Sequence, residues 1–447
     1  MNRNNSSYMS VVTRIAPSPT GEMHIGTVRT ALFNYLFAKH HGGTYFVRIE
    51  DTDKERNRPE WVEAIWRDFE WCGIVPDKRY VQSEHLSRHR ELLEGLVAAG
   101  KAYISKEPAK DDASRTVEIV RLKNPGTSVT FTDLVRGEVT FDTTELGDFV
   151  IARSITDPLY HFAVVADDGD AGVTHVLRAE EHISNTPRQI LIQEALGFPR
   201  PHYGHLPLIL APDRSKLSKR KHGASVNVYR DRGFIPEAMI NYLALLGWNP
   251  GTEQEIFSMQ ELVEAFDLSH VHHAGAIFDE TKFTWFNREY LTRMPDDRFE
   301  ASARDRIAAK RPWTGPGLSR IMPIIRERIS LWGDLDAMID GGELDYFFTA
   351  PTLDAGRIPD KKSTPETARE HLQYIQTVIA SMPDSIEADT LKAALWDYAT
   401  EKGRGAVLWP LRYALSGRDR SPDPFVLSSI LGKQEVISRV SVAIALL

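Results

Sequence analysis

The chain of 447 residues contains a single cysteine, Cys72. One thiol excludes an intrachain disulfide and fits a reducing compartment. No apolar run is long enough to span a bilayer, and residues 1–10 are polar and lack the apolar core of a signal peptide. We therefore expect a cytoplasmic protein that makes no contact with a membrane.

The common phosphate-binding signatures are also missing. The sequence has neither a Walker lysine loop nor a G-x-G-x-x-G motif, and it shows no internal repeat or low-complexity tract. Its formal net charge of −8 argues against a protein that coats nucleic acid indiscriminately. The basic stretch at 200–232 still allows an RNA partner, because local positive charge is what binds phosphate. A solvated basic loop is the alternative.

A turn-rich loop, Arg-Ile-Ala-Pro-Ser-Pro-Thr-Gly-Glu-Met-His-Ile-Gly-Thr, occupies residues 14–27. It follows a short apolar run and precedes apolar residues at helical spacing, which end at Gly42. Residues 45–49 then predict a strand that leads into Glu50. Strand, helix and strand in this order indicate a parallel sheet with the loop at its carboxyl edge, where nucleotides bind with their phosphates over a helix N-terminus.

The rest of the chain predicts several further domains. Helical patterns occupy residues 61–71 and 87–100, and short β-rich runs mark an insertion between about 101 and 160. Two apolar runs, at 162–166 and 173–177, predict a return to parallel strands, followed by a helix at 185–196 and a strand at 206–210. From Pro236 onward the pattern is helical. The fold class is therefore multidomain α/β plus all-α.

A second short segment, Lys-Leu-Ser-Lys-Arg at residues 216–220, predicts a lysine-rich loop whose positive charge is suited to the same phosphates. With the opening loop it resembles the His-Ile-Gly-His and Lys-Met-Ser-Lys-Ser signatures of class I aminoacyl-tRNA synthetases. The surrounding residues narrow the likeness to bacterial-type glutamyl-tRNA synthetases. Thr27 and Arg220 depart from the general signatures, as is usual in the glutamyl branch.

The resemblance implies a domain for each segment. Residues 1–100 and 164–212 would form the two halves of a Rossmann-type catalytic domain, split by an acceptor-stem-binding insertion at 101–163. Residues 213–300 would contact the tRNA stem, and 301–447 would form helical anticodon-binding domains. The implied partners are tRNA-Glu, L-glutamate and ATP with its own Mg²⁺, and the expected state is a monomer. No protein-bound metal is expected: some relatives hold zinc through a Cys-x-Cys pair in the insertion, where this chain has Tyr103, Ile104 and Ser105.

The resemblance also assigns the ATP site and the catalytic residues. An imidazole before a helix can hydrogen-bond a phosphate oxygen, and a glycine beside it leaves room for the nucleotide. The catalytic residues are predicted to be His24, Lys219 and Lys216. The full predicted ATP site comprises His24, Gly26, Thr27, Glu181, Lys216, Leu217, Ser218, Lys219 and Arg220.

A substrate with two carboxylates needs cationic pockets and an anion for its ammonium group. Arg14 and Arg178 each follow or end a predicted strand, and guanidinium holds a carboxylate through two hydrogen bonds. Glu50 is the natural partner of the ammonium group, and the resemblance adds Ala16, Ser18 and Tyr160. The alternative for each arginine is a surface salt bridge.

Several other functions fit parts of the sequence. A catalytically silent RNA-binding paralogue should lack His24 or Lys219, and both are present. The related enzyme that glutamylates a modified base lacks a long helical tail, and glutaminyl-tRNA synthetase has a β-barrel in its place. A non-discriminating enzyme that also charges tRNA-Gln stays an alternative, because the sequence does not identify the tail residues that read the anticodon.

Overall fold

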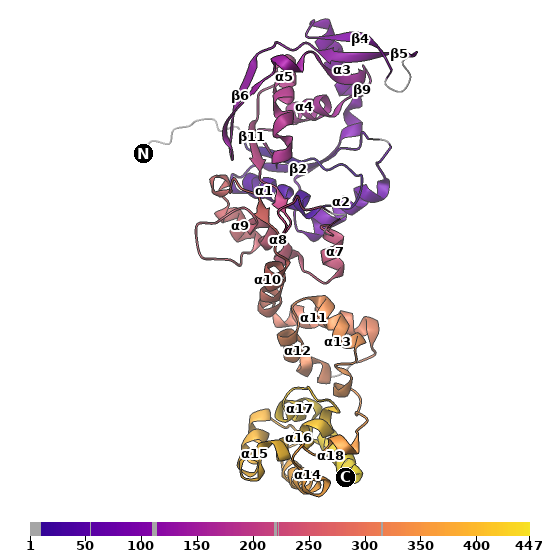
Figure 1. Cartoon of the computed structure of the whole chain (residues 1–447), viewed down its shortest axis with the longest axis vertical. Helices are drawn as coiled ribbons and strands as arrows, with labels where there is room; N and C mark the ends of the chain where they lie inside the picture. Colours follow the sequence, from indigo (N-terminus) through magenta and orange to yellow (C-terminus); the bar gives the residue numbers. More distant parts are fainter. Residues whose placement is uncertain (1–9, 54, 110–113, 219–220, 222, 314–315) are drawn as a thin grey trace. The chain divides into compact units, whose positions relative to one another are not determined.

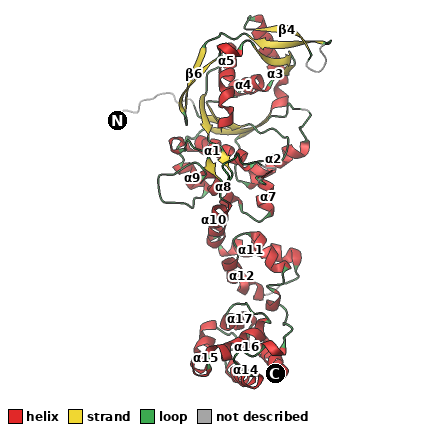
Figure 2. Cartoon of the chain, in the orientation of Figure 1, coloured by secondary structure: helices red, strands yellow, loops and turns green. Residues whose placement is uncertain are grey.

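The computed structural model describes residues 10–53, 55–109, 114–218, 221, 223–313 and 316–447. The chain divides into two compact units, Met1–Tyr290 and Leu291–Leu447 (Figure 1). Among the described residues the strands all belong to the first unit, whereas the second is helical (Figure 2). The predicted combination of an α/β region and an all-α region is confirmed.

The opening loop lies at the edge of a parallel sheet, as predicted. Strand β1 (Val12–Ile15) pairs in parallel with β2 (Thr44–Ile49), which pairs in parallel with β3 (Lys78–Val81). Helix α1 (Ile25–His40) connects β1 to β2 and is buried along most of its length. Helices α2 (Pro59–Trp71) and α3 (Leu86–Ala98) agree closely with the predicted helical segments.

A second sheet continues from β1. Val12 donates its N–H to Thr174 Oγ1 at 2.8 Å, and the N–H of Thr174 donates to the carbonyl of Val12 at 3.0 Å. Strand β10 (His175–Ala179) begins there and pairs in parallel with β11 (His202–Leu206), with helix α5 (Thr186–Leu196) between them in the chain. The carboxyl ends of β1, β2 and β10 therefore lie near one another, which is the arrangement that forms nucleotide sites in such sheets.

One predicted strand is a helix. Residues 162–166 lie in α4 (Tyr160–Asp170), which is buried from Phe162 to Asp168. A short apolar run does not distinguish a buried strand from a buried helix, because both faces meet the protein interior and the period is lost. The return to the parallel sheet thus comes one element later, at β10.

The insertion forms two different structures. Strands β4 (Ala102–Pro108), β5 (Thr116–Leu122), β8 (Phe149–Ser154) and β9 (Asp157–Pro158) make an antiparallel sheet in that order. The hairpin of β6 (Ser128–Asp133) and β7 (Gly137–Asp142) instead joins the parallel sheet, where Asp133 pairs with Tyr203 of β11. The insertion therefore reaches the parallel sheet of β10 and β11 through this hairpin.

The remainder of the first unit is mostly helical. Strand β12 (Ile209–Leu210) pairs in parallel with β13 (Ala276–Ile277). The strand predicted at 206–210 is interrupted at Pro207, since β11 ends at Leu206 and β12 begins at Ile209. The helices are α7 (Val226–Asp231), α8 (Pro236–Leu245), α9 (Met259–Ala265) and α10 (Glu280–Arg293). Arg29 connects α1 to this region through the carbonyls of Leu246 and Pro207.

The second unit has its own apolar core, which includes Phe299, Leu335, Leu372 and Leu411. Its helices are α11 (Asp296–Lys310), α12 (Pro316–Arg328), α13 (Trp332–Asp340), α14 (Pro365–Ala380), α15 (Ala388–Lys402), α16 (Arg404–Ser416), α17 (Pro424–Leu431) and α18 (Lys433–Leu446). In the described part of the chain, no helix is long and apolar enough to cross a membrane.

Candidate active site

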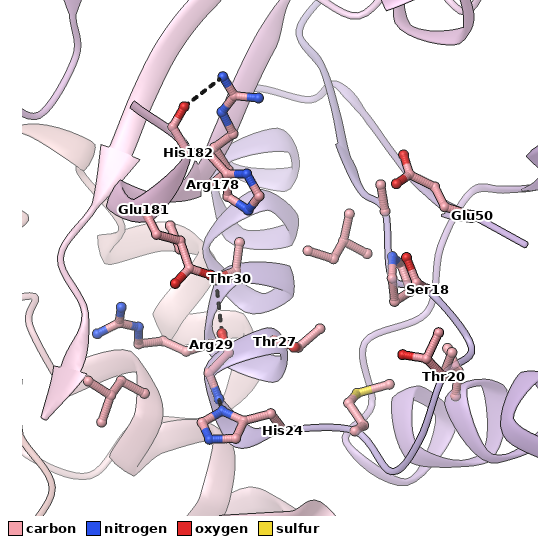
Figure 3. Close-up of a pocket in the computed structure, with 18 of the residues that line it drawn as sticks. Ser18, Thr20, His24, Thr27, Arg29, Thr30, Glu50, Arg178, Glu181 and His182 are labelled. Atoms are coloured by element: carbon pink, nitrogen blue, oxygen red, sulfur yellow. Dashed lines mark hydrogen bonds between the residues drawn. The ribbon is translucent and has the colours of Figure 1, made fainter. Parts of the chain in front are cut away.

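A cavity of about 920 Å³, here called the main cavity, opens at the carboxyl ends of β1, β2 and β10. Figure 3 shows Ser18 and Glu50 on one side, Arg178, Glu181 and His182 on the other, and the start of α1 at His24 between them. The main cavity is lined by every predicted site residue within the described part of the chain: Arg14, Ala16, Ser18, His24, Gly26, Thr27, Glu50, Tyr160, Arg178, Glu181, Lys216, Leu217 and Ser218. Lys219 and Arg220 lie outside the described residues.

His24 caps the start of α1. Its Nδ1 accepts the N–H of Gly26 at 2.9 Å. In the neutral ring this contact places the proton on Nε2, which is thereby a hydrogen-bond donor at the positive end of the helix. A Cβ on Gly26 would lie 2.9 Å from His24 Nδ1. Glycine is therefore needed for the imidazole to fold over the helix start.

The two signature segments meet in space. Ile25 donates its N–H to the carbonyl of Ala224 at 3.1 Å, and Val226 donates to that of Met23 at 3.0 Å. The segment after the basic loop thus pairs with the start of α1. Lys216 forms an ion pair with Glu181, and both side chains are about half exposed. Because such surface pairs contribute about 0–1 kcal/mol, Lys216 can move to a phosphate at little cost.

Arg14 and Glu50 belong to a buried network of charged side chains that also contains Arg48 and Asp168. Asp168 accepts from Arg14 Nε and Nη2 at 3.0–3.2 Å and from Arg48 Nη1 at 2.6 Å. Arg48 also donates to Glu50 Oε1 at 3.0 Å. Burial alone would raise the pKa of Asp168, but the two guanidinium groups hold that pKa below its ordinary value. The salt bridge of Arg14 is thus buried and not at the surface, and it fixes the guanidinium at the cavity wall.

Arg178 differs from Arg14 in its partners. It is 6% exposed, and its N–H groups donate to His205, Gln189, Thr186 and a backbone carbonyl. Among the residues that the structure describes, it forms no ion pair with a carboxylate. Burial lowers the pKa of Arg178. A buried cation without a counter-ion is costly, so this side chain is suited to an anionic ligand.

Several polar residues of the site were not predicted from the sequence. Arg48 interrupts the apolar strand at 45–49, and a charge inside a buried strand requires a partner, which was the available signal. Asp168 lies two residues after the segment predicted as a strand and belongs to helix α4, so its contact with Arg14 was not predicted. Arg29 and His182 also line the main cavity. Burial lowers the pKa of Arg29 to about 10 and that of His182 to about 4.

A second cavity, of about 1020 Å³, lies within the helical unit. Its wall contains Arg328, Arg357, Arg418 and Arg420, of which Arg328 pairs with Glu343 and Arg357 with Asp419. Arg420 forms no hydrogen bond or ion pair with any described residue. Because Glu343, Asp345 and Asp419 also line it, the four arginines leave the second cavity a formal charge of +1.

No group of three or more His, Cys, Asp or Glu side chains in the described ranges is arranged to hold a metal ion. Cys72 is 3% exposed, and burial raises the pKa of its thiol above the ordinary value. It is accordingly an inert residue at the end of α2.

The chain is similar to known proteins along nearly its whole length. A family model described as "tRNA synthetases class I (E and Q), catalytic domain" matches residues 10–112 and 105–285, and one described as "Anticodon binding domain" matches residues 288–444. The fold is thus that of a class I aminoacyl-tRNA synthetase.

The closer relationship is to one branch of that class. A glutamate–tRNA ligase of Desulforudis audaxviator is 38% identical, covering 98% of this chain and 96% of the relative, and one of Oleidesulfovibrio alaskensis is 37% identical, covering 98% and 99%. The crystal structure of a glutamate tRNA ligase from Elizabethkingia meningosepticum in complex with its amino acid has a TM-score of 0.85, with 32% identity over 98% of this chain and 99% of that one. The chain belongs to the glutamate–tRNA ligase family. This confirms the family predicted from the two signatures, and no finding supports the silent or non-discriminating alternative.

Proposed function

We propose that the main cavity activates L-glutamate with ATP and transfers it to the 3′-terminal adenosine of tRNA-Glu. The observation that carries this proposal is the convergence of both signature segments and the cationic residues Arg14 and Arg178 on one cavity. Charging of purified tRNA-Glu with glutamate tests it, and charging of tRNA-Gln in parallel measures discrimination. Failure of the protein to charge either tRNA would refute the proposal.

The chemistry needs no general base for its first step. The α-carboxylate of glutamate is ionised at neutral pH and attacks the α-phosphorus of ATP, while the bond to pyrophosphate breaks. The 2′-hydroxyl of the terminal adenosine then attacks the carbonyl carbon, and AMP leaves. Catalysis is therefore positioning and charge stabilisation, supplied by His24 Nε2–H, by the basic loop with Lys216 and Lys219, and by the Mg²⁺ that ATP carries.

Glutamate is proposed to bind between the two walls of the main cavity. Arg178 takes one carboxylate, since it is buried, lines the main cavity and has no carboxylate partner among the described residues. Arg14, oriented by Asp168, acts on the other, and Glu50 accepts the ammonium group. Burial raises the pKa of Glu50 while Arg48 opposes that rise, so Arg48 favours the carboxylate form that an ammonium group requires.

The helical unit is proposed to bind the anticodon. The basic residues proposed to contact the RNA phosphates are Lys402, Arg404, Arg412, Arg418 and Arg420. Arg418 and Arg420 line the second cavity. Arg404 lies over the ring of Trp396 at 4.3 Å, and Arg412 donates to the carbonyl of Asp419 at 2.6 Å. Exposed arginines around a cavity suit single-stranded bases and their phosphates. A cytoplasmic location and a monomeric state complete the proposal.

Replacing His24 with alanine or asparagine is expected to slow glutamyl-adenylate formation by roughly 100-fold or more, since one donor to developing charge contributes about 3 kcal/mol to the barrier. Asparagine is the informative variant, because its side-chain oxygen still caps α1 through the Gly26 N–H. It therefore keeps the helix and removes the Nε2 donor. Pyrophosphate exchange in the presence of tRNA measures the rate.

His40→Ala, at the other end of α1, provides the control. His40 is exposed and contacts the carbonyl of Val263, away from the main cavity. Its removal should leave exchange within about twofold of the wild-type rate. Near-wild-type exchange in His24→Asn would rule out the phosphate role of His24.

The purified protein is expected to hold no structural zinc. A tetrahedral site rich in sulfur needs several thiolates, and the chain has one cysteine, whose buried thiol resists ionisation. Metal analysis after dialysis against zinc and then against metal-free buffer measures the content. About one retained zinc per chain would contradict the expectation.

A further inference from the structure

The orientation of Arg178 depends on a histidine behind it. The guanidinium donates from Nη1 to Gln189 at 2.6 Å and from Nη2 to Thr186 at 2.8 Å. Its Nε–H donates to His205 Nε2 at 3.2 Å, and the same Nε2 lies 3.1 Å from Thr186 Oγ1. The first two partners are neutral at every pH of interest, whereas the imidazole changes between acceptor and donor with its proton position.

The contacts of His205 specify one tautomer. Arginine Nε can only donate, so His205 Nε2 must accept, and the single proton of the neutral ring lies on Nδ1. Nδ1 is 2.6 Å from Asp133 Oδ2, which accepts that proton in a hydrogen bond. Both side chains are fully excluded from solvent. A proton on Nε2 would instead face the Nε–H of Arg178.

Asp133 is itself held in one orientation. Its Oδ1 accepts three backbone N–H groups, those of Val135 at 3.0 Å, Arg136 at 2.9 Å and His205 at 3.2 Å. Oδ2 is thereby left for the imidazole. Asp133 is the last residue of β6, so this carboxylate comes from the inserted hairpin and reaches the sheet beside β11.

We propose that Asp133 and His205 are positioning residues that hold the guanidinium of Arg178 toward the substrate carboxylate, by keeping the imidazole in its Nδ1–H tautomer. The proposal rests on the proposed binding of glutamate by Arg178. It assigns to the inserted hairpin a part in amino-acid binding, through a chain of three side chains that leads from β6 to the cavity wall.

The charges around His205 set the pH at which this arrangement fails. Arg178 faces it from β10, Asp133 from β6 and Arg136 from the turn after β6, while the rings of Tyr203 and Phe131 pack beside it. Burial, opposed by the hydrogen bond to Asp133 and reinforced by the charge of Arg178, lowers the pKa of His205. The neutral ring therefore persists below the ordinary histidine range, and the KM for glutamate should rise only at pH below about 6.5.

Asp133→Asn tests the tautomer directly. The one remaining side-chain oxygen keeps the hydrogen bonds from the three backbone N–H groups. The amide nitrogen therefore faces His205 Nδ1 and donates to it. The ring proton must then move to Nε2, against Arg178. We expect the KM for glutamate to rise by about ten- to a hundredfold, the usual effect of losing a hydrogen bond to a charged group. The KM for ATP should stay within twofold, and ¹⁵N NMR should show His205 changing from the Nδ1–H to the Nε2–H form.

A matched pair at His205 separates positioning from packing. Asparagine reaches Asp133 but not Arg178, whereas glutamine places its side-chain oxygen near the position of Nε2 and can accept from Arg178. His205→Asn should raise the KM for glutamate as Asp133→Asn does. His205→Gln should restore a KM within a few fold of the wild-type value.

Arg178→Ala, measured alongside, distinguishes the proposed role of Arg178 from the positioning role of Asp133 and His205. If Arg178→Ala leaves the KM for glutamate unchanged, the proposed role of Arg178 fails. If Arg178→Ala raises that KM but Asp133→Asn does not, or the ring stays in the Nδ1–H form, the positioning role is wrong. It is equally wrong if both His205 variants lose glutamate affinity, ATP affinity and kcat together, as a purely structural defect would cause.

Discussion

Replacing Arg178 with alanine is expected to raise the KM for glutamate by roughly 30- to 4,000-fold, with little change in the KM for ATP. An unpaired carboxylate in a closed pocket costs about 2–5 kcal/mol, and each 1.4 kcal/mol is a factor of ten. Arg178 should show the full effect because it is 6% exposed and forms no ion pair with any described carboxylate. Steady-state charging of tRNA at varied glutamate measures both constants.

Arg14→Ala is expected to have a similar effect on glutamate but a larger one on folding. Its loss leaves Asp168 with Arg48 as its remaining guanidinium partner. Breaking a buried pair by removing one member typically costs 3–5 kcal/mol of stability. Thermal unfolding should therefore distinguish the two variants, with the lower midpoint in Arg14→Ala.

Arg188→Ala is the control for both arginine variants. Arg188 lies on α5, close to Arg178 in the chain, but it does not line the main cavity. Loss of this cation should leave the glutamate KM within about twofold. A glutamate KM that survives the removal of both Arg14 and Arg178 would place the amino-acid site elsewhere.

The signature segments could be predicted because their function requires particular residue types close together in the sequence. A histidine before a helix, a glycine beside it and a lysine-rich loop are recognisable from their order alone, and so is the strand-helix-strand frame around them. The residues behind the site are different. Asp168, His205 and Asp133 act on Arg14 and Arg178 from elements far away in the chain, and only the folded sheet brings these side chains together.

The mistaken strand at 162–166 illustrates the same limit. Helix α4 carries Tyr160 at its start and Asp168 near its end, so one element supplies both the wall of the main cavity and the anchor of Arg14. In a strand, successive side chains point to opposite faces of a sheet. In the buried helix α4, Tyr160 lines the main cavity and Asp168 contacts Arg14. Tyr160, which the family resemblance assigns to the glutamate pocket, lines the main cavity from the start of this helix.

Removal of the helical unit is expected to abolish efficient charging of whole tRNA while leaving the first unit folded. The structure refines the position of the cut. Glu300 lies inside α11, whereas Pro295 precedes it, so ending the chain after Met294 keeps α10 intact. Each unit has its own buried core, which supports independent folding.

The decisive comparison is the charging of whole tRNA-Glu and of an acceptor-stem minihelix by the full-length and shortened enzymes. The full-length enzyme should strongly prefer whole tRNA. The shortened enzyme should charge both substrates at similar, low rates, because the anticodon contacts are gone. Its activity should also depend less on salt, since each lost phosphate contact lowers the slope of log affinity against log salt by about one.

A double substitution in the intact chain locates the contact without truncation. Arg418→Ala with Arg420→Ala removes two cations from the second cavity, and Lys361→Ala with Lys362→Ala removes two exposed cations that do not line it. The arginine pair should raise the KM for whole tRNA and leave that for the minihelix unchanged, whereas the lysine pair should change neither by more than about twofold. Equal losses in the two pairs would mean that general positive charge, and not the second cavity, attracts the tRNA.

If the shortened enzyme charges whole tRNA as well as the intact one does, the helical unit does not read the anticodon.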